Sequence, residues 1–317
     1  MTLRSSLRSD EEEPNDALFR GSDSSYGKDL IRIVADNSLQ SAAPDAKPPR
    51  RLTKARIHEL LESVLSYSDI RTLSVLQKAK YLSTKQVMRL YFSDSPTERS
   101  AIRRTVRHLK RLEQLGLIST FKRRIGGTRA GSSSYVWFLT EGGQRLLDTK
   151  NGNESKRRPH RYLEPSYGLM RHTLAIADCY VQLVELSRRD LSHILSTTVW
   201  EPDCWREYKK DSRPCYLKPD LYFRIHSLGY EDSWFLEVDM GTEPIPRILN
   251  KCERYIDYFN TGLEQRNRKV FPLTLWLVPN SNRRDAVANA IREKFPKHVV
   301  MFRVACMEQF IEAITQV

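Results

Sequence analysis

Residues 217–258 read LKPDLYFRIHSLGYEDSWFLEVDMGTEPIPRILNKCERYIDY. Apolar and polar side chains alternate with period two on both sides of a turn-forming segment at 227–230, which predicts the two strands of a hairpin. With the turn centred there, we expect position 220 opposite 239 and position 222 opposite 237. Side chains of equal parity share one face of such a hairpin, so Asp220, Glu237 and Asp239 should converge on one face and the apolar residues on the other.

Three carboxylates on one face repel each other unless a cation offsets their charge. A hard divalent cation takes oxygen ligands, so the pattern predicts Mg²⁺ or Mn²⁺ held by Asp220, Glu237 and Asp239. The alternative is a solvated outer face on which Arg224 and Lys218 serve as ion-pair partners.

The segment after the hairpin predicts a helix that begins near Pro244 and Pro246. Its apolar residues recur at helical spacing: Ile245, Ile248, Leu249, Cys252, Ile256 and Phe259. Arg247, Lys251 and Arg254 lie on the flank of that stripe. A cationic helix edge beside an acidic hairpin face suits phosphodiester chemistry, in which acids hold a metal and a cation stabilises the phosphate.

Composition places the positive charge in one part of the chain. The 317 residues carry a net charge of +13, and residues 51–161 hold 24 Lys and Arg against 9 Asp and Glu. A basic domain beside a near-neutral one predicts nucleic acid as the partner. The five cysteines have no CxxC pairing, the N-terminus does not read as a signal peptide, and no apolar run is long enough to span a membrane, which favours a cytoplasmic protein.

We expect four regions along the chain. Residues 1–50 are rich in Ser, Asp, Glu and Pro and predict a disordered arm. Residues 51–149 predict a winged helix-turn-helix domain, and residues 150–164 a basic linker. Residues 165–317 predict an α/β domain with a mixed sheet, from the order helix, hairpin, helix, strand, helix, strand, helix, so the chain is α/β in class and α+β overall.

The winged-helix prediction rests on a basic helix followed by a basic hairpin. The helix should run from about Pro96 to Leu115 and end at Gly116. The expected contacts to double-stranded DNA are cations of the helix and the wing: Arg99, Arg103, Arg104, Arg107, Lys110, Arg111, Lys122, Arg123, Arg124 and Arg129. The alternative is that this domain is a protein-interaction module. Because winged helices also act as dimerisation units, the sequence is also compatible with a homodimer.

Pro219-Asp220 on one strand and Glu237 on the next resemble the PD-(D/E)xK nuclease-like fold. In that family the two acids bind magnesium, and a lysine two residues after the glutamate helps to activate water. Asp239 stands in that place here, so the resemblance implies a lysine from the following helix, Lys251 or less directly Arg247. It also implies a further acid from the first helix or the preceding strand, for which Asp178 and Glu201 are the candidates.

A second resemblance covers the run from about Ile70 to Tyr258, which is similar to the replication-relaxation family of bacterial plasmids and mobile elements. The matching pieces are LSTKQVMRLYF, RRTVRHLKRLEQLGLI, YVWFLTEGGQRLL, KPDLYF, and FLEVDMGTE with its downstream K..RYIDY. Asp239 is typical of this family. The resemblance implies a role in plasmid replication and in relaxing or nicking plasmid DNA, with replication or mobilisation proteins as partners.

Two functions follow from these patterns. The first is a metal-dependent nickase in which Asp220, Glu237 and Asp239 hold the ion and Lys251 stabilises the developing charge; a variant would use Tyr222, Tyr255 or Tyr258 as a nucleophile. The second is a non-catalytic initiator or transcriptional regulator, in which the nuclease-like domain serves dimerisation or partner docking.

Overall fold

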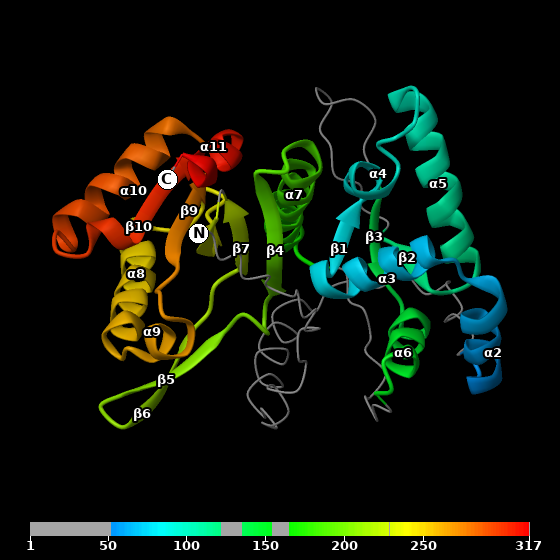
Figure 1. The fold of residues 1–317 in the computed structure, drawn as a ribbon, viewed down its shortest axis with the longest axis horizontal. Helices are drawn as coiled ribbons and strands as arrows, with labels where there is room; N and C mark the ends of the chain where they lie inside the picture. The colour runs from blue at the N-terminus through cyan, green and yellow to red at the C-terminus, as the bar shows by residue number, and fades with distance from the viewer. Residues whose placement is uncertain (1–51, 122–134, 154–164, 228, 317) are drawn as a thin grey trace, which may run out of the picture. The chain divides into compact units, whose positions relative to one another are not determined.

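The computed structural model describes residues 52–121, 135–153, 165–227 and 229–316. Arg50–Val317 form one compact unit, and the predicted arm, residues 1–50, lies outside the described ranges. The first elements of this unit are helices and short strands (Figure 1): α2 (Lys54–Glu59), the π-helical turn η2 (Leu60–Val64), α3 (Tyr67–Ala79), β1 (Tyr81–Ser83), α4 (Thr84–Tyr91), α5 (Glu98–Gln114), β2 (Ile118–Thr120), β3 (Val136–Leu139) and α6 (Glu141–Lys150).

Side-chain caps set the starts of these helices. Ser66, Ser83 and Thr97 each accept a bond from the backbone N–H three residues on, and the residue at that third position bonds back, so α3, α4 and α5 all begin with a capping box. Gly116, at a φ of +74°, ends α5 as predicted, because a left-handed residue there costs glycine little.

The three short strands form one antiparallel sheet in the order β1-β3-β2. The register pairs Leu82 and Thr120 with Trp137 from opposite sides, and the Trp137 indole N–H donates to the Thr84 hydroxyl at 2.9 Å. The sequence predicts helices, a basic helix and then two strands, the order of a winged helix-turn-helix, and the structure adds the short strand β1 between α3 and α4.

Helical spacing predicts that the buried stripe of α5 is Ile102, Val106, Leu109 and Leu112, and the face that the helix buries is rotated slightly from it. Ala101, Thr105, Leu109 and Leu112 are buried, whereas Ile102 is 41% exposed. The predicted stripe favoured the larger apolar residue at 102, but the small Ala101 side chain is the one that allows close packing.

The second half of the unit contains the larger sheet. Its elements are α7 (Tyr167–Arg189), β4 (His193–Trp200), β5 (Arg206–Lys210), β6 (Arg213–Leu217), β7 (Leu221–Ser227), β8 (Tyr230–Val238), α8 (Ile245–Asn260), α9 (Leu263–Arg268), β9 (Leu273–Val278), α10 (Ser281–Lys294), the 3-10 turn η3 (Val299–Met301), β10 (Phe302–Cys306), the 3-10 turn η4 (Met307–Gln309) and α11 (Phe310–Thr315).

Five of these strands form a mixed sheet in the order β10-β9-β8-β7-β4. Strands β4, β7 and β8 pair antiparallel, and β9 and β10 continue parallel to β8. Helix α7 precedes the antiparallel strands β4, β7 and β8, and α8, followed by the short α9, lies between β8 and β9, so the main elements of the sheet have the order αβββαβ. This is a restriction-endonuclease-like α/β domain with a mixed sheet, as expected.

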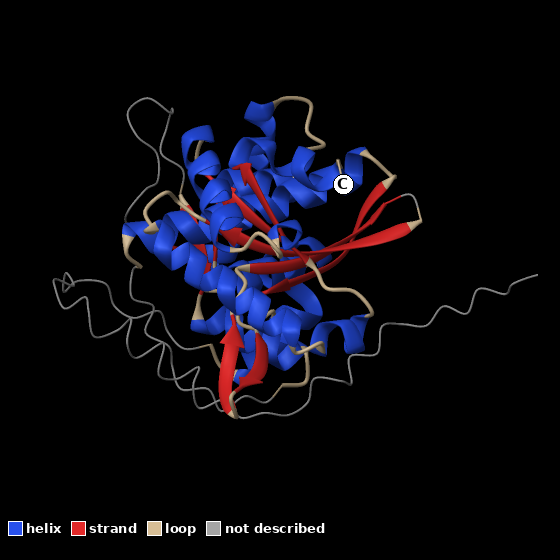
Figure 2. Ribbon diagram, turned by 90° about the vertical axis from the view of Figure 1, so that its left-hand side faces the viewer, coloured by secondary structure: helices blue, strands red, loops and turns tan. Residues whose placement is uncertain are grey.

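Helices cover both faces of this sheet (Figure 2). On one face, Phe223, Trp234 and Leu236 pack with the apolar residues of α7 and α11. On the other face, Tyr222 and Phe235 pack with Tyr255 of α8, and Trp276 packs with α8 and α10. The strands are therefore buried on both sides, and a polar side chain on either face needs a partner.

The β7–β8 register differs by two residues from the predicted one. Ser227 pairs with Tyr230 and Leu221 with Leu236, so position 220 falls opposite 237 rather than 239. The turn lies at the predicted residues 227–230, and a turn centred there places 220 opposite 237, so the expected pairing with 239 was wrong by two residues. Gly229, at a φ of +91°, tolerates the backbone of this turn. A shift of two preserves parity, so Asp220 and Glu237 still share a face.

Helix α7 joins the two halves of the unit. The Gln86 side-chain amide donates to the Leu174 carbonyl at 2.8 Å. Arg89 of α4 pairs with Asp178 at 2.6 Å and Glu185 at 2.5 Å. Apolar residues of both halves belong to one continuous core. The predicted linker lies mainly in residues 154–164, outside the described ranges.

The sequence prediction has no counterpart for strand β1, the β5–β6 hairpin or the short helix α9. Among the helices that the structure describes, none is long and apolar enough to cross a membrane.

Candidate functional site

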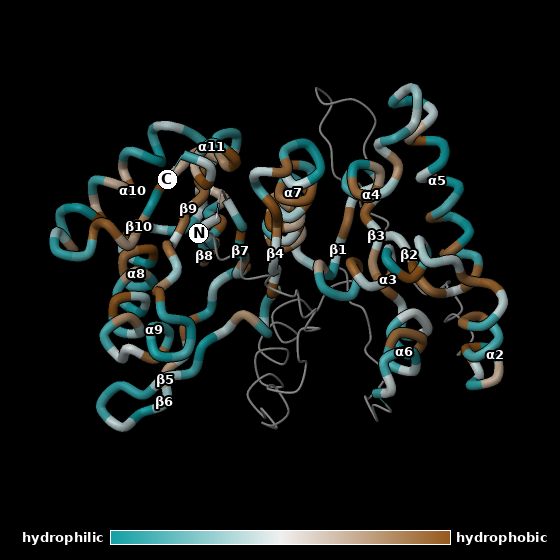
Figure 3. Tube along the Cα trace, viewed as in Figure 1, coloured by the Kyte–Doolittle hydropathy of each residue, from teal (hydrophilic) through white to brown (hydrophobic). Residues whose placement is uncertain are grey.

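The exposed side of α5 carries a row of three arginines. Arg99, Arg103 and Arg107 are exposed, recur every four residues, and contact no partner among the described side chains. This spacing places all three on one side of the helix. Teal segments along α5 in Figure 3 mark the same polar side. The row is a multivalent cationic surface whose charges are free to meet an anion.

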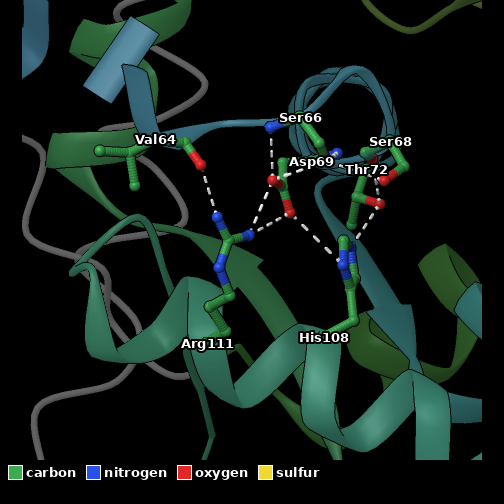
Figure 4. Close-up of polar contacts among 7 residues, drawn as sticks. All are labelled: Val64, Ser66, Ser68, Asp69, Thr72, His108 and Arg111. Carbon is green, nitrogen blue, oxygen red and sulfur yellow. Dashed lines mark hydrogen bonds and ion pairs between the residues drawn. The ribbon is translucent and has the colours of Figure 1, made fainter. Parts of the chain in front are cut away.

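Arg111, predicted with the same group, has a different environment. Its Nη1 atom donates to Asp69 Oδ2 at 2.7 Å and Oδ1 at 2.8 Å, and its Nη2 atom donates to the Val64 carbonyl at 2.6 Å (Figure 4). The Asp69 carboxylate is fully buried and also accepts from Ser66 and faces His108 at 3.4 Å. Arg111 therefore anchors α5 to the start of α3.

Two further residues predicted to contact DNA, Arg104 and Lys110, are exposed but bonded to neighbouring side chains. Arg104 bonds Asp94 at 3.2 Å and Ser95 at 2.7 Å, and Lys110 bonds Glu113 at 2.7 Å, all at the surface. Both cations keep about half of their side-chain surface exposed. Lys122, Arg123, Arg124 and Arg129 lie outside the described residues.

A second cluster of charged groups lies where β7 begins and β8 ends. Asp220 precedes β7, and its amide bonds the Leu236 carbonyl at 3.0 Å, which fixes it opposite Glu237. Its Oδ2 atom accepts from the Val238 amide at 2.8 Å. Asp220 is 8% exposed and Glu237 is fully buried. The sheet thus holds two carboxylates side by side, out of bulk water.

Helix α8 supplies the groups that face Glu237. Lys251 Nζ donates to Glu237 Oε2, and the Tyr255 hydroxyl donates to Oε1 at 2.5 Å. Positions 251 and 255 lie one turn apart on one side of the helix, whose start at Pro244 was predicted. Lys251, the lysine that the resemblance to the PD-(D/E)xK fold implies, therefore contacts Glu237 directly.

His172 of α7 is a member of this cluster that the sequence analysis did not assign. Its Nε2 atom lies 3.3 Å from Asp220 Oδ2. Burial lowers the pKa of His172, but the bond to Asp220 and the charges of Asp220 and Glu201 outweigh it, so the pKa lies above its usual range. A histidine 48 positions from its partner, on a separate helix, leaves no spacing signal.

The pKa values of Asp220 and Glu237 are shifted in opposite directions. Burial raises the pKa of Glu237 to about 8, and the Asp220 charge adds to this against the opposing effects of Lys251 and Tyr255. Burial also works against ionised Asp220, but Lys251, His172 and the Val238 amide outweigh it and lower its pKa. The Lys251 pKa is raised because the two acids outweigh burial. Such a split makes Asp220 the resident anion and Glu237 the group that can take up a proton.

Asp239, expected in the same set, is bound elsewhere. Its Oδ2 atom accepts from Arg283 Nε at 2.7 Å, and its Oδ1 atom accepts from the Gly241 amide at 2.8 Å. Asp178 pairs with Arg89, and Glu201 pairs with Lys80 at 2.8 Å. In the part of the chain that is described, no three His, Cys, Asp or Glu residues group as a metal site.

The pair of carboxylates fits a hard cation by its donor chemistry. Mg²⁺ commonly binds one or two carboxylates and completes its shell with water and substrate phosphate. Asp220 and Glu237 are the residues that would hold it, and Asp220 Oδ1 has no partner among the described groups.

The three tyrosines considered as nucleophiles are all buried. Tyr255 donates to Glu237, Tyr258 donates to Glu264 at 2.6 Å, and the Tyr222 hydroxyl accepts from Arg268 at 3.3 Å. Burial first, and then the Glu237 charge, raise the pKa of Tyr255 well above its usual value. A neutral, buried hydroxyl is poorly placed to attack a DNA strand.

Comparisons with solved structures give two weak likenesses. The structure of restriction endonuclease FokI shares 12% identity over 82% of this chain and 72% of that one, with a TM-score of 0.22. FokI bound to DNA shares 11% identity over 83% of this chain and 72% of that one, with a TM-score of 0.23. The assignment of the fold rests on the strand order β10-β9-β8-β7-β4 and its register.

No curated protein matches the chain. The profile of the replication-relaxation family matches residues 73–274, which include α4, α5, the β7–β8 hairpin, α8 and every residue of the Asp220–Glu237–Lys251 cluster. This span is well over half of the 317 residues. The chain therefore belongs to the replication-relaxation family.

Proposed function

We propose that this protein binds duplex DNA of a plasmid or mobile element through the arginine row of α5, in a winged helix-turn-helix, and nicks it with the Asp220–Glu237–Lys251 cluster. Family membership supports a role related to replication or relaxation. The observation that carries the nicking proposal is the contact of Lys251 Nζ with Glu237 Oε2, beside Asp220. This contact brings a cation from α8 to the two acids at the start of β7 and the end of β8, which supports a site of the PD-(D/E)xK kind.

For the DNA-binding step, the free row of Arg99, Arg103 and Arg107 is the main support. Guanidinium groups bind phosphates or guanine edges in a two-point fashion. A helix that presents several of them on one exposed face, anchored at its other end through Arg111, suits insertion into the major groove.

For the cleavage step, each residue of the cluster has a separate task. A divalent cation held by Asp220 and Glu237 would polarise the scissile phosphate and lower the pKa of water. Lys251, partly exposed, would leave Glu237 and stabilise charge on the phosphate. His172 holds Asp220 in place through its 3.3 Å contact.

The test is nicking of supercoiled plasmid by the full chain with Mg²⁺ or Mn²⁺. We expect nicking by the wild type and its loss in Asp220→Asn and Glu237→Gln, with duplex affinity unchanged in both variants. Arg107→Ala is the matched control, because it should weaken DNA binding without removing the cluster. Nicking that persists in both acid variants would refute the assignment of the site.

A second candidate function has its own support. Both oxygens of Glu237 already have donors, and its side chain is shut off from solvent. The same cluster could therefore stabilise the sheet in a non-catalytic initiator or regulator. Intact duplex binding with no metal-dependent nicking by the wild type would favour this function over the first.

A further inference from the structure

The β5–β6 hairpin lies between β4 and β7 in the sequence but outside the five-stranded sheet. It forms a separate two-stranded sheet, and Figure 1 shows it extending away from the other strands. Its last strand ends at Leu217, three residues before Asp220. Anything bound along this hairpin is thus led toward the start of β7, where the acidic cluster lies.

One face of the hairpin is used for packing. Tyr208 lies 5.6 Å from the Tyr258 ring, Lys210 pairs with Asp257 at 2.8 Å, and Arg206 pairs with Glu264 at 3.0 Å. These partners belong to α8 and α9. Alternation along a strand therefore turns the odd-numbered residues of β5 away from these helices.

The opposite face, which we call the outer face, combines aromatic rings and cations. The register pairs 207 with 216 and 209 with 214, and its continuation brings 205 opposite 218. Lys218 Nζ lies 4.3 Å from the centre of the Trp205 ring and 5.8 Å from that of Tyr216. Lys209 is exposed, and one acid, Glu207, shares the face. The two rings hold the Lys218 ammonium between the strand ends.

Positive charge on this face exceeds what its own acid can neutralise. The charged residues of this face are Lys209, Lys218 and Glu207, because Arg206, Lys210 and Arg213 lie on the packing face. Lys209 and Lys218 have no ion-pair partner within the described ranges, and neither does Arg254 of α8, whose charge acts on Lys218.

We infer that the outer face of the β5–β6 hairpin binds an unpaired DNA strand and leads it to Asp220. Aromatic rings that stack bases, interleaved with cations that follow the backbone, are the means by which proteins bind single strands without sequence preference. A duplex would present its bases inward and leave Trp205 and Tyr216 without a role. The inference rests on the proposed function only in naming what the strand is for; the binding itself does not require cleavage.

Intrinsic fluorescence provides a direct test, because Trp205 differs from the other tryptophans. All five are described, and Trp137, Trp200, Trp234 and Trp276 are at most 7% exposed. Titrating an oligothymidylate of about 20 nucleotides into the full chain should quench the fluorescence of Trp205. Trp205→Phe should lose the quenching but keep the affinity, measured by anisotropy of a labelled oligonucleotide, since phenylalanine also stacks.

The charge test uses Lys209→Gln combined with Lys218→Gln. Removing one cation that binds a phosphate should lower the salt dependence of single-strand binding by about 0.7 in log–log slope, so the pair should lower it by about 1.4 and weaken affinity severalfold. A second pair, Lys209→Gln with Arg254→Gln, leaves Lys218 and its contacts with the Trp205 and Tyr216 rings in place. This pair should give the same result. Arg292→Gln with Lys297→Gln, two exposed cations at α10 and just beyond it, is the matched control.

Unchanged single-strand affinity and slope in both hairpin pairs would overturn the inference, and so would quenching by duplex alone. These readouts are separate from the proposed function. Loss of duplex binding in Arg103→Ala, or a failure to nick plasmid, changes neither the quenching of Trp205 nor its dependence on the hairpin cations.

Discussion

Arg111→Ala separates the structural cation of α5 from its DNA-binding cations. The variant removes two bonds to Asp69, at 2.7 and 2.8 Å, and one to the Val64 carbonyl. The Asp69 side chain is fully buried, so its charge would remain without the guanidinium. Ser66 still donates through its amide and its hydroxyl, and His108 stays within 3.4 Å.

The expected cost follows from this geometry. Removing one partner of a buried ion pair costs about 3–5 kcal/mol. Arg111 is 43% exposed and Ser66 keeps two bonds to Asp69, so the cost should lie at or just below the low end of that range, at about 2–3 kcal/mol. For a folded unit of this size we expect Tm to fall by about 4–6 °C. Arg103→Ala with Arg107→Ala, both exposed and without a partner among the described side chains, should change stability by less than about 0.5 kcal/mol per site.

The assays are thermal unfolding of each variant and duplex binding across a range of salt concentrations. The double variant should keep its Tm, lose affinity, and lower the log–log salt slope by about 1.8. Arg111→Ala should have a lower Tm than the wild type. At temperatures below that Tm, its duplex binding should keep nearly the wild-type log–log salt slope. The reasoning is refuted if Arg111→Ala keeps its Tm and lowers the slope, because Arg111 would then bind a phosphate.

Three further predictions follow from the described contacts. The folded-state pKa of Glu237 is raised to about 8, so its contribution to stability is present below its ordinary pKa of 4.5 and is lost as the pH rises through 8. Urea unfolding at pH 5 and pH 8.5 should therefore differ less in Glu237→Gln than in the wild type. Arg283→Ala leaves the buried Asp239 carboxylate without its guanidinium partner and should lower the free energy of unfolding by about 3 kcal/mol, which urea unfolding measures. Acid should destabilise the α3–α5 contact, because the pKa of Asp69 is lowered and its stabilisation is lost as the pH falls through that folded value; amide exchange at α5 reports this.

The parts of the site that the sequence predicts are those set by local periodicity. Asp220 and Glu237 share a face because the period of a strand is two, and a two-residue error in register does not change that. Lys251 reaches Glu237 because a helix starting at Pro244 repeats every 3.6 residues. The exposed row on α5 follows from the same helical period.

The parts that sequence reasoning missed depend on contacts between distant segments. His172 meets Asp220 only because α7 packs on the sheet. Arg283 of α10, 44 positions further along the chain, pairs with Asp239. Arg111 has the same residue type and flank as its neighbours, and only the approach of α3 makes it structural. The β5–β6 hairpin begins Arg-Glu-Tyr-Lys-Lys, which lacks the apolar alternation that marks a half-buried strand.

Calorimetric titration of Mn²⁺ into the full chain tests the central claim, that Asp220 and Glu237 form a divalent-cation site. The wild type should release or absorb heat with a saturable, one-site profile, and Asp220→Asn, which keeps the size of the side chain, should abolish it. Arg283→Gln serves as the control, because it alters the Asp239 pair and leaves the cluster intact. No saturable heat in the wild type, or an unchanged profile in Asp220→Asn, would contradict the account.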